Sequence, residues 1–117
     1  MNLQELTDVM LLQPGKVLAL EQDYIDLSKN YAEHIREMGD IKAHIDADVA
    51  SNKALKNPEE RKMAILSACD AHGRYQILKK DTPDEDTNIK KLFAQIKYER
   101  DIFDIYLALA RMRADGV

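Results

Sequence analysis

Residues 16–45, which read KVLALEQDYIDLSKNYAEHIREMGDIKAHI, carry the clearest structural signal in the chain. Bulky or apolar side chains recur along this stretch at alternating intervals of three and four residues, which is the heptad spacing of a helix that packs along one face. Charged side chains fill most of the other positions, as on the solvated side of an amphipathic helix. The pattern predicts one long helix from Lys16 to about Leu55. Its packing stripe comprises Val17, Leu20, Tyr24, Leu27, Tyr31, His34, Met38, Ile41 and Ile45.

This predicted helix is longer than a compact domain of the same chain length. At about 1.5 Å per residue, a straight helix of that extent spans about 60 Å, whereas a globule of this size has a diameter of roughly 35 Å. Either the helix kinks near Gly39 or the protein is elongated and built on a coiled coil. The heptad spacing favours the coiled coil.

The N-terminal residues carry a separate helix signal. Asn2, with Glu5 three residues later, resembles a capping box and predicts a short helix over residues 3–12. Pro14 and Gly15 follow it, and proline lacks the backbone donor that a helix interior needs. We therefore expect a break between this short helix and the long one.

Two further helix starts share one composition, a capping side chain followed by a proline and acidic residues. The first is residues 57–60, Asn-Pro-Glu-Glu, which predicts a third helix running to about Lys80 with Gly73 as a weak point. The second is residues 82–85, Thr-Pro-Asp-Glu, which predicts the start of a last helix that ends near Arg113.

Length and composition fit one folded, all-α domain. The 117 residues match the usual size of a single domain, and 45% hydrophobic with 32% charged residues separates the chain from disordered sequences. Lys and Arg number 17 against 21 Asp and Glu, a formal charge of −4. We predict an elongated helical bundle formed by a short N-terminal helix, a long amphipathic coiled-coil-like helix and two further helices, over one oligomerising domain of residues 1–117.

The chain lacks the sequence signals of export. No apolar run reaches 18 residues, the N-terminus carries acidic rather than basic side chains, and Cys69 is the one cysteine. We therefore expect no membrane span, no secretory signal, no internal disulfide and a cytoplasmic location, in the host cytoplasm if the protein is phage-encoded.

The C-terminal helix has more apolar surface than one packing face needs. Between Ile102 and Leu109, only Asp104 and Ala108 are not large and apolar. Other helices of the same chain could cover this surface, or subunits could meet there. The second reading predicts a homo-oligomer. Its expected interface comprises Tyr98, Ile102, Phe103, Ile105, Tyr106, Leu109 and Met112.

Catalytic and metal-binding patterns are weak. Cys69 and His72 form half of a zinc site, whereas a closed site takes four ligands. His34 lies on the packing stripe, and Asp40 with His44 fits a surface pair better than a metal site. We expect a non-enzyme without metal or cofactor.

Basic residues gather around the junction before and within the third predicted helix. Lys53, Lys56, Arg61 and Lys62 lie there, and Arg74, Lys79 and Lys80 follow. Phosphate backbones bind through summed Lys and Arg contacts, so this cluster predicts a nucleic-acid-binding surface. The alternative is an ordinary solvated helix junction.

The helix order, the Ala54-Leu55-Lys56 step and the stretch LFAQIKYERDIFDIYL at residues 92–107 resemble the tailed-phage recombination mediators, the UvsY-like proteins. In that family, small helical subunits form a ring-like oligomer that binds single-stranded DNA and helps to load a RecA-type recombinase while displacing the single-strand-binding protein. The resemblance implies DNA contact near Lys56, although Pro58 replaces the arginine of the family pattern. It also implies subunit association through the C-terminal helix.

A second function class is a coiled-coil adaptor, chaperone or host-directed inhibitor that binds a protein and no nucleic acid. The acidic first half of the chain supplies a contact face for such a partner, and it carries Glu33, Glu37, Asp40, Asp46 and Asp48.

Overall fold

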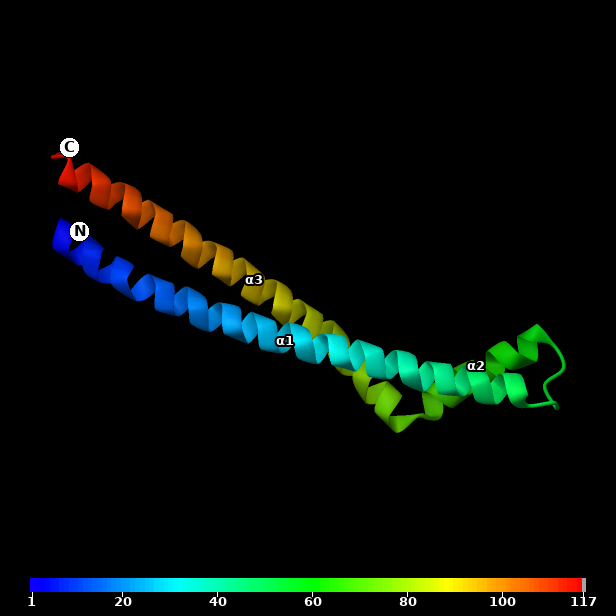
Figure 1. The fold of residues 1–117 in the computed structure, drawn as a ribbon. Coiled ribbons are helices and arrows are strands. Elements are labelled where there is room, and N and C mark those ends of the chain that lie inside the picture. Colours follow the sequence, from blue (N-terminus) through cyan, green and yellow to red (C-terminus); the bar gives the residue numbers. More distant parts are fainter. Residues whose placement is uncertain (117) are drawn as a thin grey trace. The chain divides into compact units, whose positions relative to one another are not determined.

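The computed structural model describes residues 1–116 and contains three α-helices: α1 (Leu3–Ser51), α2 (Pro58–Ala71) and α3 (Gly73–Ala114) (Figure 1). The described residues form no strand, which confirms the predicted all-α class. The number of helices differs from the predicted four. None of the helices in the described part is both long and apolar enough to span a membrane.

The contacts divide the chain into two compact units, each built from segments of α1 and α3. Unit 1 contains residues 1–28 and 88–116, and unit 2 contains residues 29–87, which include α2. Within each unit the α1 and α3 segments run antiparallel. As the residue number increases along α1, the number of the α3 residue that it contacts decreases. In unit 2, for example, His34 contacts Glu85 and Met38 contacts Thr82.

The start of α1 follows the prediction, but the predicted break at Pro14 is wrong. The Asn2 side chain accepts a hydrogen bond from the Glu5 backbone N–H at 2.8 Å, which caps the first turn. The helix then continues through Pro14 and Gly15 to Ser51. Proline removes one intrahelical hydrogen bond, at a cost of about 3 kcal/mol relative to alanine. Packing on both sides of the proline offsets this cost, since Leu6 and Gln13 before it are almost completely buried and Val17 after it is half-buried.

Helix α2 begins as predicted and ends earlier than predicted. The Asn57 side chain accepts a hydrogen bond from the Glu60 N–H at 2.8 Å, with Pro58 at the first helical position. The helix ends at Ala71 rather than near Lys80. His72 has an extended backbone, and its Nδ1 accepts a hydrogen bond from the Tyr75 N–H at 3.1 Å. His72 therefore caps the start of α3.

The predicted helix start at Thr82 is also wrong, because α3 passes through Pro83 without interruption. The predicted capping residue Thr82 and the acidic residue Glu85 make contacts with α1 instead. The Thr82 hydroxyl lies 4.0 Å from the Met38 sulfur, and a Glu85 carboxylate oxygen lies 2.7 Å from His34 Nδ1. The tertiary contacts of these side chains thus replace the local capping role that the sequence suggested.

The packing stripe predicted for α1 faces α3 in both units. Its members are buried or half-buried except Leu27, which is 37% exposed. The stripe continues toward the N-terminus as Leu6, Met10 and Gln13 with the same three-four spacing. The matching stripe of α3 consists of buried or half-buried residues, namely Tyr75, Leu78, Thr82, Glu85, Ile89, Leu92, Ile96, Glu99, Phe103, Tyr106 and Ala110.

The two units differ in how many helices share the core. In unit 2, Ile45 and Val49 of α1 pack with Cys69 of α2, and Tyr75 of α3 lies against this cluster. In unit 1, only the α1 and α3 segments pack together, with Leu6 and Ile96 buried between them. Two helices can cover one stripe each, so the remaining faces of unit 1 stay open to solvent.

Candidate nucleic-acid interface

A groove of about 600 Å³ in unit 2 brings together basic side chains from all three helices. Lys42 comes from α1, Arg61 and Lys62 from the first turns of α2, and Lys79 from α3. All four side chains are solvent-exposed. Because the sequence separation between Lys42 and Lys79 is large, only the antiparallel pairing of α1 with α3 places them at one groove.

The groove also has an apolar and an acidic part. Ile65, Leu66 and Tyr75 contribute apolar and aromatic surface, and Asp46 and Asp70 are the acidic members of the lining. Four cationic groups against two carboxylates leave the groove with a positive balance. The local charge thus has the opposite sign from the whole chain, whose formal charge is −4.

Local structure holds the α2 end of the groove in place. The Asn57 cap fixes the first turn of α2, and the Glu60 carboxylate accepts a hydrogen bond from the Lys56 N–H at 3.1 Å. Arg61 Nε donates a hydrogen bond to the Leu55 carbonyl at 3.3 Å. Arg61 therefore has a structural contact, whereas Lys62 offers a cleaner position for mutational tests of ligand binding.

The structure brings part of the predicted basic cluster together at this groove. Of the four predicted residues, Arg61 and Lys62 line the groove, while Lys53 and Lys56 lie in the exposed connection between α1 and α2. Lys42 lies outside the predicted basic cluster, and Lys79 belongs to that cluster but not to the four predicted contact residues. Each directly follows a member of the packing stripe, so the antiparallel register of the two helices is the signal that would have revealed them.

Arg74, another member of the predicted basic cluster, is held in an ion pair. Its Nε and Nη2 donate hydrogen bonds to the two carboxylate oxygens of Glu37 at 2.8 and 2.9 Å. These hydrogen bonds hold the pKa of the Glu37 carboxyl below its usual value and raise the pKa of Arg74 above its own. Both carboxylate oxygens of Glu37 are therefore already hydrogen-bonded, which leaves this residue less available for contact with a protein partner.

The histidine and cysteine candidates have structural roles in the fold. Cys69 is buried in the core of unit 2, and His72 Nδ1 is engaged by the Tyr75 N–H. His34 is paired with Glu85 between α1 and α3. Within residues 1–116, no group of three or more His, Cys, Asp or Glu side chains is placed to hold a metal ion.

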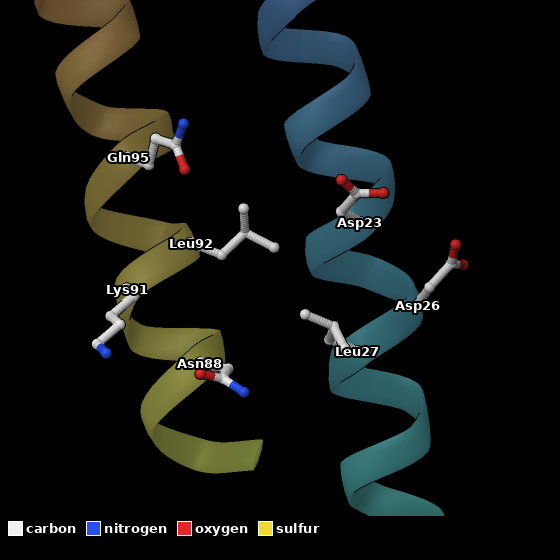
Figure 2. A pocket seen from close by; sticks show the side chains of 7 residues that line it. All are labelled: Asp23, Asp26, Leu27, Asn88, Lys91, Leu92 and Gln95. Carbon is white, nitrogen blue, oxygen red and sulfur yellow. The ribbon is translucent and has the colours of Figure 1, made fainter. Parts of the chain in front are cut away.

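Unit 1 has a smaller hollow of about 420 Å³ between its α1 and α3 segments (Figure 2). Figure 2 shows Leu27 and Leu92 pointing toward one another, whereas Lys91 points away from α1. Asp23 and Asp26 line the α1 side. The side chains that converge here are apolar members of the packing stripes, so this hollow is an open edge of the helix pair.

The predicted subunit interface divides into exposed and half-buried members. Tyr98, Ile105, Leu109 and Met112 are exposed, and we name these four residues the C-terminal apolar row. Phe103 and Tyr106 are half-buried members of the α3 packing stripe, and Ile102 is also half-buried. The surface available to another molecule is therefore smaller than the sequence suggested, but it remains apolar.

Comparison with known proteins adds no relative: no family model, no curated protein and no solved structure matches the chain.

Proposed function

We propose that this chain is a self-associating helical protein that binds single-stranded DNA through the groove of unit 2 and serves as an accessory factor in homologous recombination. The observation that carries the proposal is the convergence of Lys42, Arg61, Lys62 and Lys79 on one groove. Cationic side chains from separate elements that border one groove can follow a phosphate backbone.

The aromatic member of the groove favours a single strand over a duplex. Tyr75 lines the groove beside Lys79 and Arg61. Proteins that bind single strands combine a positive groove with aromatic side chains on which bases stack, and such stacking is tolerant of sequence. The bases of a duplex are already stacked on one another, so a tyrosine side chain in the groove adds less binding energy for a duplex than for a single strand.

The charge of the whole chain limits what one subunit does alone. A net charge of −4 opposes long-range attraction of DNA to a monomer. Association of several subunits repeats the groove along one strand and raises the effective concentration of each site. We therefore assign tight binding of long strands to the assembled form. The partners that this function implies, a RecA-type recombinase and a single-strand-binding protein, rest on the family resemblance.

The proposal is tested by salt-dependent binding of oligo-dT. The double variant Lys62→Ala/Lys79→Ala should bind more weakly than wild type. It should also lower the slope of log affinity against log salt by about 1.4, because each lost phosphate contact removes about 0.7 for a single strand. Fluorescence anisotropy of a labelled oligonucleotide at several salt concentrations measures both quantities.

A matched control removes the same charge elsewhere. Lys16→Ala/Lys97→Ala changes two exposed lysines of unit 1 and should leave the affinity and the slope near the wild-type values. The proposal is wrong if wild-type protein fails to bind at low salt, or if the two double variants weaken binding equally.

The second candidate is a protein-binding helical module without nucleic-acid binding. The observation that favours it is the exposed C-terminal apolar row, since exposed apolar surface commonly marks protein contact sites. Retention of a defined protein partner by wild-type protein, together with no retention on immobilised oligo-dT, would select this function.

A further inference from the structure

A second apolar row lies exposed on α1 of unit 1. Leu11, Leu18 and Ile25 are 74%, 67% and 57% exposed. Seven residues are close to two helical turns, so these side chains line up along the helix. We name them the N-terminal apolar row. Three large apolar side chains in one line exceed the scattered exposure that is ordinary on a protein surface.

The two rows lie on opposite sides of the α1–α3 pair in unit 1. An ion pair between Glu21 and Arg100 marks one side, and Leu18 borders a groove of about 530 Å³ with these same two residues. Leu109 follows Arg100 by nine residues, which is two and a half turns at about 3.6 residues per turn. The C-terminal apolar row therefore points away from the side on which the N-terminal row lies.

We propose that the N-terminal apolar row of one copy is the docking surface for the C-terminal apolar row of a second copy. The rows have the same period, because Tyr98, Ile105 and Met112 repeat every seven residues as Leu11, Leu18 and Ile25 do. Two helices whose apolar side chains repeat at the same interval can bring all three residues of each row into contact at once. The repeat distance on each helix is about 10 Å.

Charge favours this pairing over the pairing of like rows. The α1 segment of unit 1, residues 1–28, has five acidic side chains and one basic side chain. The α3 segment, residues 88–117, has six basic and four acidic side chains. An α1 surface therefore attracts an α3 surface, whereas α1 against α1 or α3 against α3 brings like net charge together.

The shape of the N-terminal side also suits an incoming side chain. The groove beside Leu18 has Val17 and Phe103 among its lining, with Glu21 and Arg100 at its polar part. The central residue of the partner row, Ile105, can enter this apolar groove, while Tyr98 and Met112 on either side of it lie against Leu11 and Ile25. Contacts of this kind remove apolar surface from water on both copies.

Each copy then uses two different surfaces, so the association is head-to-tail and does not stop at a dimer. The inference rests on the self-association in the proposed function and is independent of DNA binding. Beyond the proposed function, it names the surface of α1 that the C-terminal apolar row of another copy contacts.

The test uses the full chain with one row altered at a time. Leu18→Glu disrupts the N-terminal row and Ile105→Glu disrupts the C-terminal row, and both positions are exposed, so the fold should persist. Circular dichroism checks the helix content. Sedimentation velocity measures the mass of each variant alone and of an equimolar mixture.

Wild-type protein should exceed the mass of a dimer, and each variant alone should be a monomer. The mixture should form a dimer and nothing larger, because it retains one intact pair of rows. Ala19→Glu adds the same charge to an exposed position of α1 outside the row and should assemble as wild type does.

The inference is overturned if Leu18→Glu assembles like wild type, if the mixture stays monomeric, or if wild-type protein is itself a monomer. Oligo-dT binding, measured separately on the wild-type protein, decides the DNA-binding function. The failure of one proposal is therefore distinguishable from the failure of the other.

Discussion

Gln13 shows how a single polar residue can serve a helix pair. It is only 2% exposed, and its Nε2 donates hydrogen bonds to the Glu99 backbone carbonyl and to the Glu99 carboxylate. A buried polar pair in a heptad seam costs stability relative to apolar residues but restricts the register, because any slip leaves both groups without partners. In unit 2, His34 and Glu85 form a comparable polar contact.

Removal of one member of this pair should be more harmful than removal of both. Gln13→Leu leaves the half-buried Glu99 carboxylate without its donor, and we expect the free energy of unfolding to fall by about 1–3 kcal/mol. The double variant Gln13→Leu/Glu99→Leu should recover most of this loss, since no polar group is left unpaired. Urea unfolding at fixed protein concentration measures both values.

Gln22→Leu is the matched control for Gln13→Leu. Gln22 lies on the exposed side of α1, where its side chain bonds only one turn away to Asp26. Its replacement should change the unfolding free energy by less than about 0.5 kcal/mol. Equal instability of the single and double Gln13 variants would contradict the role assigned to the pair.

At the scale of a helix, α1 and α3 each continue through a proline. Pro14 is exposed at the edge of the α1–α3 pair, and the packing stripe keeps its three-four spacing from Met10 through Gln13 to Val17. In α3, Leu78, Thr82 and Glu85 keep the same spacing past Pro83. A long stripe packed against a partner helix thus outweighs the local effect of one proline.

Pro14→Ala should therefore stabilise the protein. Alanine restores one hydrogen bond and fits a helix interior better, so we expect the free energy of unfolding to rise by about 1–3 kcal/mol. Thermal and urea unfolding check the change. Pro58→Ala is the control, because proline at the first position of a helix is well tolerated and its replacement should have little effect. An unchanged stability of Pro14→Ala would favour a helix break at this position.

At the scale of the whole molecule, the surface features belong to different units. The basic groove lies in unit 2, and both apolar rows lie in unit 1. Association through unit 1 uses none of the residues that line the groove, so under the proposed function several grooves are available to one DNA strand. Binding and assembly can be separated by mutation for the same reason.

Loss of assembly should weaken binding to long DNA much more than binding to short DNA. With Ile105→Glu, the affinity for an oligo-dT of roughly 10 nucleotides, the length of one site, should match that of wild type. The affinity for an oligo-dT several times longer should fall by at least about tenfold, because avidity is lost. Anisotropy with both oligonucleotides measures the difference, and an equal change on both lengths would contradict the separation of the two functions.

The sequence by itself determined the all-α class, the packing stripe of α1, the Asn2 and Asn57 caps and the location of the basic cluster. These features depend on local periodicity and capping chemistry, which a few neighbouring residues define. The stripe also continues across Pro14 and across Pro83 in the sequence, where its three-four spacing opposes the local preference of proline to end a helix.

Only the tertiary structure decided which residues share a surface. The pairing of α1 with α3 placed Lys42 and Lys79 at one groove. It also engaged Thr82 and Glu85 in contacts with α1 instead of a helix cap. Phe103 and Tyr106 became half-buried in the same pairing. The physical reason is that helical periodicity defines the faces of one helix, whereas the partner of each face depends on long-range packing between segments distant in the chain.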